Sequence, residues 1–284
     1  MTLSPKLRAL LQTGKAHNIQ LALNLAPHQI SSVDWQPFWE IGTWLQTIGI
    51  LSEPLPQSLA ELLQILTNLS TLTIEGTKVQ KLPSTLGHIL GLQELHILGG
   101  QFSSLPPSIT HLEQLQLLFL PKGALESLPV ELGDLRALER LFLNDNQLHN
   151  IPDSIQQLHN LQQIELSNNL LRTFPTNLSA LPQLHYLALS GNPLSLSPYD
   201  FEPFPALKVL LINNLQLTGE QLPISLKNLK QLEELDLSNN QLTYLPSFLG
   251  KLKQLKYLNL RGNPLSENQV PLNLLQQPSL KILW

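Results

Sequence analysis

The chain has 284 residues, no cysteine and a formal net charge of −4, and 72 of its residues are leucine. The lack of cysteine excludes disulfide-braced ends, a thiol nucleophile and cysteine-ligated zinc. Only 13% of the residues are charged, and the slightly acidic balance offers no basic face of the kind that binds nucleic acid.

Residues 1–44 are predicted to form an N-terminal helical cap. Pro5, preceded by Ser4, stands at a helix start and Gly14 just past its end, which are the places that proline and glycine favour. Residues 18–26 predict a second helix that ends before Pro27. A strand is the alternative, because apolar residues also alternate there.

Residues 32–44 contain three of the four tryptophans: Trp35, Trp39 and Trp44. We interpret them as one helical face that seals the start of the apolar core that follows. A ligand-binding aromatic box is the less favoured alternative.

Residues 45–284 are predicted to form a second domain of about ten strands. Residues 45–50 fit a degenerate first strand, and residues 56–66 fit the helix-like segment after it. Six units then begin 23 residues apart, at Leu69, Leu92, Leu115, Leu138, Leu161 and Leu184, and further units begin at Leu207, Leu232, Leu255 and Leu280. The last predicted strand comprises residues 280–284 and stops abruptly. Either Trp284 covers the final core layer, or the chain is truncated there.

The unit that starts at Leu161 reads L-x-x-L-x-L-x-x-N-x-L-x-x-L-P-x-x-L-x-x-L, with conservative replacements. This string resembles the leucine-rich repeat superfamily, and most closely its bacterial and intracellular members with LPxxL segments. The resemblance implies an α/β solenoid, a right-handed superhelix with a concave parallel β-sheet and short helices or irregular turns on the convex side. It also implies a scaffold for binding.

The repeated residues are interpreted as architecture. Alternation places the leucines of L-x-x-L-x-L inward. Asparagine at the ninth place can satisfy backbone groups where the chain leaves the strand, and it recurs as Asn146, Asn169, Asn192, Asn240 and Asn263. Thr77, Gly100, Gly123 and Leu215 replace it, so their units are expected to turn less regularly. Proline at LPxxL predicts a bend into a short helical turn.

Residues 194–206 lack the LPxxL pattern and contain Tyr199, Phe201 and Phe204. We expect these aromatic side chains to pack into the core, and a docking loop is the less favoured alternative.

Sequence motifs for catalysis or cofactor binding are absent, so we expect no enzyme and no cofactor. His88, His111 and Asp134 occupy the same place in three consecutive units. Their expected spacing would allow them to share a metal ion. Exposed positions that vary freely from repeat to repeat explain the column equally well, so we assign no metal site.

Outward positions of the strands form two columns on the predicted concave face. The first column contains Glu94, Leu117, Arg140, Gln163, Tyr186, Val209, Glu234 and Tyr257, and the second contains His96, Phe119, Phe142, Glu165, Ala188, Leu211, Asp236 and Asn259. An apolar patch is expected at Leu98, Leu117, Phe119 and Phe142, with a weaker one at Tyr186, Val209 and Leu211. An acidic group, Glu233, Glu234 and Asp236, lies beside Lys208 and Lys256 and is either a solvated face or a contact for a basic partner.

The leading hypothesis is a non-enzymatic scaffold that binds a protein or peptide on the concave sheet, with Phe119 and Phe142 as anchors. The candidate binding residues are His96, Leu98, Leu117, Phe119, Arg140, Phe142, Glu165, Tyr186, Val209, Leu211, Glu234, Asp236, Tyr257 and Asn259. A bacterial effector or regulatory module that recruits substrates for an enzyme on another chain is the alternative, and a structural spacer is a third. Neither a membrane span nor a secretory signal is visible, so we expect a cytoplasmic monomer that binds no nucleic acid.

Overall fold

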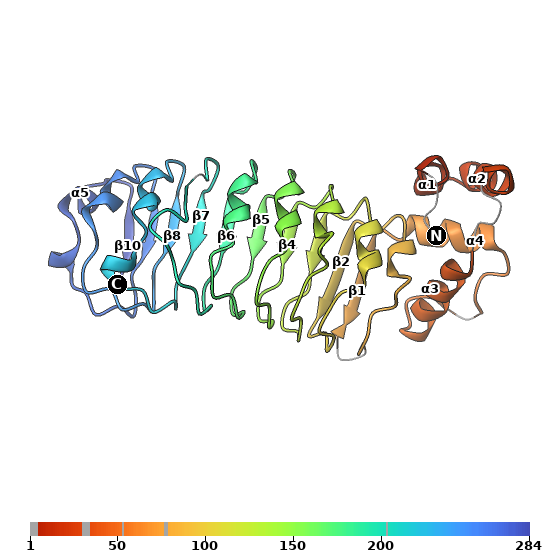
Figure 1. Cartoon of the computed structure of the whole chain (residues 1–284), viewed down its shortest axis with the longest axis horizontal. Coiled ribbons are helices and arrows are strands. Elements are labelled where there is room, and N and C mark those ends of the chain that lie inside the picture. The colour runs from red at the N-terminus through yellow and green to blue at the C-terminus, as the bar shows by residue number, and fades with distance from the viewer. Residues whose placement is uncertain (1–4, 30–34, 53, 77–78, 203) are drawn as a thin grey trace.

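The computed structural model describes residues 5–29, 35–52, 54–76, 79–202 and 204–284. Four helices lie at one end of an elongated molecule, and a single parallel sheet runs along the rest of it (Figure 1). Within the described residues the sheet has ten strands in chain order, each paired with the next, so it forms an α/β solenoid behind a helical cap.

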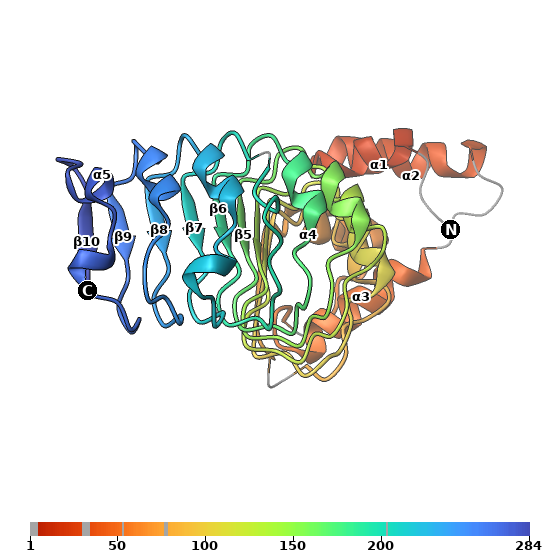
Figure 2. The ribbon, with the colours of Figure 1, turned by 60° about the vertical axis from the view of Figure 1, so that its left-hand side comes forward.

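The strands follow the predicted repeat. Their bounds are β1 (Thr71–Glu75), β2 (Glu94–Leu98), β3 (Leu117–Phe119), β4 (Arg140–Phe142), β5 (Gln163–Glu165), β6 (Tyr186–Ala188), β7 (Val209–Leu211), β8 (Glu234–Asp236), β9 (Tyr257–Asn259) and β10 (Lys281–Leu283). The second residue of each strand from β1 to β9, which is Leu72 in β1 and Leu95 in β2, points inward and is at most 1% exposed. Figure 2 shows the strands from β5 to β10 side by side.

Asparagine side chains form a buried ladder beneath the sheet, as predicted. Asn169 is typical: its Oδ1 accepts a hydrogen bond from the Leu148 amide at 2.9 Å, and its Nδ2 donates to the carbonyl oxygens of Leu143 and Leu166 at 2.9 and 3.0 Å. Each such asparagine therefore joins two consecutive units through backbone groups that would otherwise be buried without partners.

The residue before each ladder asparagine adopts a positive φ. Asp145, Asn168, Asn239, Gly191 and Gly262 share this left-handed conformation, which asparagine, aspartate and glycine tolerate best. At Gly191 a Cβ would lie 2.1 Å from Asn168 Oδ1, so any larger residue there would have to displace the Asn168 side chain.

The unit with Leu215 in place of asparagine turns irregularly, as predicted. Gln216 adopts an additional positive φ, and Asn240 Oδ1 accepts hydrogen bonds from the amides of both Leu215 and Leu217 at 3.0 Å. Thr77, the first of the predicted departures, lies outside the described residues.

Short helical turns follow the prolines on the other side of the array. The 3-10 helices of the described residues include Leu86–His88, Pro107–His111, Leu132–Asp134, Asp153–Gln157, Thr176–Ala180, Gly219–Gln221, Ile224–Asn228, Ser247–Lys251 and Glu267–Gln269, and the short helix α5 is Leu272–Leu275. Pro152 and Pro246 are typical of the prolines that directly precede these turns. The predicted bend into a helical turn is therefore confirmed.

The N-terminal helices are α1 (Pro5–Gln12), α2 (Ala16–Gln29), α3 (Gln36–Thr47) and α4 (Leu59–Asn68). Helix α2 continues past Pro27, contrary to the prediction, because a proline near a helix end removes only one intrahelical hydrogen bond. The proposed capping residue Ser4 lies outside the described residues.

The predicted strand at residues 45–50 is wrong. Leu45 belongs to α3, which runs to Thr47 and buries Phe38, Ile41 and Leu45. Those spacings of three and four residues fit a helix, and they prevail over the short alternation after Leu45. The predicted division after residue 44 therefore falls inside a helix.

The tryptophans do not share one face of α3. Trp35 precedes the helix, and Trp44 lies nine residues later, about half a turn away around the axis. Trp35, Trp39 and Trp44 are partly buried against the core, while Phe38 supplies the fully buried aromatic ring.

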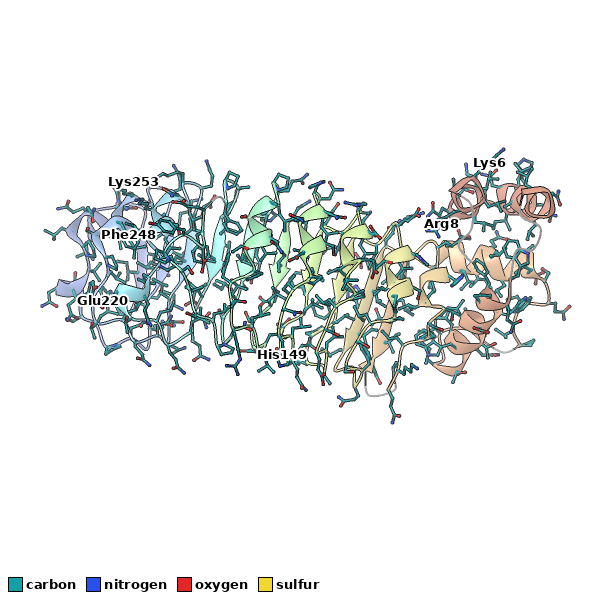
Figure 3. All side chains as sticks on the ribbon, in the orientation of Figure 1. Lys6, Arg8, His149, Glu220, Phe248 and Lys253 are labelled. Atoms are coloured by element: carbon teal, nitrogen blue, oxygen red, sulfur yellow. The ribbon has the colours of Figure 1, made fainter. Side chains whose placement is uncertain are left out.

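A polar contact ties the first helix to the repeats. The Arg8 guanidinium forms an ion pair with Glu113, and Gln12 Nε2 donates to the same carboxylate at 3.1 Å. Figure 3 labels Arg8 on α1, at the end of the molecule where the helical cap meets the first repeats.

At the other end, β10 pairs with β9 in a step of 24 residues, so that Lys281 lies opposite Tyr257. This register differs by one residue from the step of 25 that the leucine spacing predicts. Leu280 and Ile282 pack against the core, and Trp284, two residues after Ile282, is 49% exposed.

The irregular segment 194–206 packs as predicted at two of its three aromatic residues. Phe201 and Phe204 are buried and contact Phe174, with ring centroids 5.0 and 6.1 Å from it. Tyr199 is 68% exposed, so the prediction that it is buried is wrong. The two phenylalanine rings pack against Phe174, and the tyrosine, whose hydroxyl group is polar, faces solvent.

Candidate functional site

The two predicted columns are confirmed by the strand register. Glu94, Leu117 and Arg140 lie opposite one another on β2, β3 and β4, and so do His96, Phe119 and Phe142. The same pairing continues without a slip to Tyr257 and Asn259 on β9. We call the side of the sheet that bears these columns the open face, and it corresponds to the predicted concave side.

In its N-terminal half the open face bears a ladder of aromatic rings. The centroid of Phe119 lies 5.6 Å from that of His96 and 5.8 Å from that of Phe142. All three side chains are half-buried because each covers part of its neighbour. Leu98 continues β2 beyond His96 and is 54% exposed. Leu98, Phe119 and Phe142 thus form an accessible apolar area in this half of the open face.

Leu117 is not part of that accessible area, contrary to the prediction. It is only 5% exposed, although it lies on the open face. Glu94 on β2 and Arg140 on β4 form an ion pair at 3.3 Å, and Leu117 lies between them on β3. The ion pair therefore spans the leucine and shields it from solvent. Glu94 also contacts His96 Nε2 at 3.2 Å.

The C-terminal half has an apolar floor flanked by carboxylates. Tyr186, Val209 and Leu211 are half-buried, and Ala188 is fully buried. Tyr186 Oη donates a hydrogen bond to Glu165 Oε2 at 3.1 Å. Burial raises the pKa of Tyr186, and the carboxylates of Glu165 and Glu234 raise it further. The tyrosine therefore lies in the negative field of both carboxylates.

The predicted acidic group divides into two parts. Glu233 forms an ion pair with Lys256, and this contact lowers the pKa of the Glu233 carboxyl group. Asp236 accepts hydrogen bonds from the Ser238 amide at 2.8 Å and from Asn259 Nδ2 at 3.1 Å. Glu234 is exposed. In the described part of the chain, neither Glu234 nor Asp236 forms an ion pair.

Tyr257 adds an aromatic ring at the far end of the open face. Its side chain is 51% exposed, and it lies beside Glu234 in the first column. Two tyrosines, Tyr186 and Tyr257, thus stand in the same column with Val209 and Glu234 between them.

The column of His88, His111 and Asp134 lies on consecutive 3-10 helices away from the open face. The His88 ring packs edge-on against Phe38 of the cap, with centroids 4.8 Å apart, and its Nδ1 lies 3.0 Å from the Thr85 carbonyl oxygen. Burial lowers the pKa of both histidines. Within the described ranges no group of three or more histidine or acidic residues is arranged to hold a metal ion.

One surface feature was missed from the sequence. A hollow of about 540 Å³ is lined by Pro198, Tyr244, Pro246 and Phe248 and by residues 219–224. Figure 3 labels Glu220 and Phe248 near the C-terminal end of the molecule. The hollow combines segments of three different units, among them the irregular segment 194–206, so no single stretch of sequence indicates it.

Two family patterns match the chain: the one described as Leucine rich repeat matches residues 136–194, and the one described as Leucine Rich repeats (2 copies) matches residues 230–273. They match the same repeats that build the ten-stranded sheet. The chain is a leucine-rich repeat protein. No curated protein sequence matches it. No helix among the described residues is long and apolar enough to cross a membrane.

Solved structures similar to this leucine-rich repeat protein include plant receptors. One is the plant peptide hormone receptor RGFR1 in complex with RGF2, with 26% identity and a TM-score of 0.58 over 78% of this chain and 40% of that one. Another is the ectodomain of GASSHO1/SCHENGEN3 from Arabidopsis thaliana in complex with CASPARIAN STRIP INTEGRITY FACTOR 2, with 29% identity and a TM-score of 0.59 over 78% of this chain and 30% of that one.

A third similar structure is that of PEPR1-AtPEP1, with 25% identity and a TM-score of 0.59 over 74% of this chain and 31% of that one. The leucine-rich repeat protein thus spans less than half of the length of each of these chains.

Proposed function

We propose that this leucine-rich repeat protein is a non-enzymatic scaffold that binds a protein or peptide on the open face of its sheet. The observation that carries the proposal is the apolar area formed by Leu98, Phe119 and Phe142. Leaving such side chains accessible to water is unfavourable, and a partner that covers them removes that cost.

Two further observations support the proposal. The similar plant receptors include one in complex with RGF2 and one in complex with CASPARIAN STRIP INTEGRITY FACTOR 2. The open face is also continuous over nine strand steps, because every strand is paired with the next in the same register pattern. An extended partner can therefore contact several units at once.

The experiment replaces both anchors, Phe119→Ala together with Phe142→Ala, and compares partner capture from the source cells with that of the wild-type chain. Aromatic anchors at the centre of an interface commonly contribute about 2 kcal/mol or more each. We therefore expect bound proteins to fall at least tenfold. Circular dichroism and thermal unfolding check that the array remains folded.

Tyr199→Ala is the matched control, because it removes an exposed aromatic ring outside the open face. This variant should capture the same proteins as the wild type. Capture that is unchanged in the double variant would contradict binding at the aromatic ladder.

A further inference from the structure

The two halves of the open face differ in how their carboxylates are compensated. In the N-terminal half, Glu94 is held by Arg140 at 3.3 Å and by His96 at 3.2 Å. In the C-terminal half, Glu165, Glu234 and Asp236 form no ion pair with any described residue. These three carboxylates are therefore available to pair with a basic group of a bound partner.

The nearest lysines do not supply that charge. Lys256 is engaged by Glu233. Lys208 precedes β7 and is exposed, and its charge acts on the Glu233 carboxyl group, whose pKa it helps to lower. No lysine or arginine stands at a strand position of β5, β6, β7, β8 or β9. The charged side chains at the strand positions of β5 to β9 are therefore all acidic.

The surface between these carboxylates suits a long basic side chain. Val209 and Leu211 on β7 form an apolar floor, with Tyr186 on one side and Glu234 and Asp236 on the other. Lysine and arginine carry an aliphatic stem that packs on apolar surface and a charged head that stays at a polar edge. Tyrosine faces add a favourable interaction with a cation.

The strand spacing sets the distance between the two halves. Phe142 is on β4 and Asp236 is on β8, four strand steps apart in the sheet. At about 4.8 Å per step this is about 19 Å, and an extended segment advances about 3.3 Å per residue. An apolar and a basic side chain about six residues apart would therefore reach both places.

We propose that the open face binds an extended segment of a partner protein, with an apolar side chain on Leu98, Phe119 and Phe142 and a lysine or arginine about six residues away between Tyr186 and the carboxylates of Glu234 and Asp236. This inference rests on the proposed function and specifies the chemistry of its partner. The complementary charges of the segment and the C-terminal half give the contact its specificity.

The test selects binders from a displayed library of random 12-residue peptides on the full chain, followed by affinity measurements with synthetic copies of the selected peptides. We expect the peptides to share an aromatic or large aliphatic residue and a basic residue about six positions apart. Glu234→Gln with Asp236→Asn should weaken their binding about tenfold, and the wild-type affinity should fall with added salt more steeply than that of the double variant.

Glu126→Gln with Glu131→Gln is the matched control, because it removes two charges from exposed residues outside the strands. Its affinity for the selected peptides should equal that of the wild type. Replacing the basic residue of a peptide by glutamate should abolish binding to the wild type, and Glu234→Lys should restore part of it.

Failure of this inference is distinguishable from failure of the proposed function. Peptides that need Phe119 and Phe142 but lack a basic residue, or that bind the Glu234 and Asp236 variant equally well, overturn the inference and leave the proposed function standing. Peptides that are insensitive to the loss of both phenylalanines, or a library without binders, contradict the proposed function and the inference together.

Discussion

The buried asparagine ladder and the open face lie a few residues apart in every unit, yet they differ in almost every physical respect. The ladder asparagines repeat the same hydrogen bonds from unit to unit, with both the Oδ1 and the Nδ2 atoms engaged. The open face changes from rings to carboxylates along the sheet. The ladder is therefore a source of stability, and the open face carries what distinguishes one partner from another.

The largest effect on stability is expected in the ladder. Asn169→Ala leaves the Leu148 amide and the Leu143 and Leu166 carbonyl groups without these partners in a site that is 3% exposed. Buried polar groups that lose their partners cost about 1–3 kcal/mol each, and partial relaxation should limit the loss to about 2–3 kcal/mol of unfolding free energy.

Urea denaturation followed by circular dichroism measures this loss. Asn177→Ala is the control, because Asn177 donates to the exposed Asp153 carboxylate at the surface, and its loss of unfolding free energy should stay below about 0.5 kcal/mol. Equal unfolding free energies for the two variants would contradict the claim that the ladder asparagines stabilise the fold more than surface asparagines do.

A smaller effect is expected at the ion pair that covers Leu117. Arg140→Ala removes the partner of Glu94 and uncovers the leucine. Because both charged side chains are partly exposed, the loss of stability should stay below about 1 kcal/mol. Hydroxyl-radical footprinting should show increased oxidation of Leu117 in this variant, and unchanged oxidation would contradict the covering role of the ion pair.

Arg140→Met tests whether cover or charge matters at this position. A methionine side chain is long enough to pack over Leu117 without pairing with Glu94. Leu117 should then remain protected from oxidation as in the wild type, while the alanine variant loses that protection.

The smallest effect is expected from alkaline pH at Tyr186. The pKa of Tyr186 is higher in the folded chain than the ordinary value of 10.0, so the unfolded chain loses its proton first as the pH rises. Stability should therefore be unaffected below about pH 10 and should fall above it.

Thermal unfolding between pH 8 and 11 measures this dependence. In the Tyr186→Phe variant the stability should fall less above about pH 10, because phenylalanine cannot titrate. Tyr199→Phe serves as the control for an exposed tyrosine. If the stability of the wild type and of the Tyr186→Phe variant fell equally with rising pH, the raised pKa of Tyr186 would be contradicted.

Much of this arrangement was predictable from the sequence because its period is strict. A shift of one residue would turn leucines outward, so the register from β1 to β9 follows from the leucine spacing alone. The two columns of the open face follow from the same register. The prediction was wrong at residues 45–50, which precede the strict repeat. The alternation there is too short to decide between strand and helix, and the buried residues of α3 favour the helix.

Within the candidate site, the exposure of single residues was not predictable. Leu117 and Phe119 have the same apolar character and lie on the same face, but only Leu117 is covered. The cover comes from Glu94 and Arg140, which are 46 residues apart and two strands away from each other. Contacts of this kind depend on which side chains meet across neighbouring units.

The sequence by itself determined the solenoid, the inward leucines, the buried asparagines and the identity of the outward columns, because each follows from a short period and local geometry. The tertiary structure decided which outward side chains remain accessible and which charges lack a partner. These depend on distances between side chains of different units, and a linear repeat does not contain them. The open face is thus located by its sequence and characterised by its contacts.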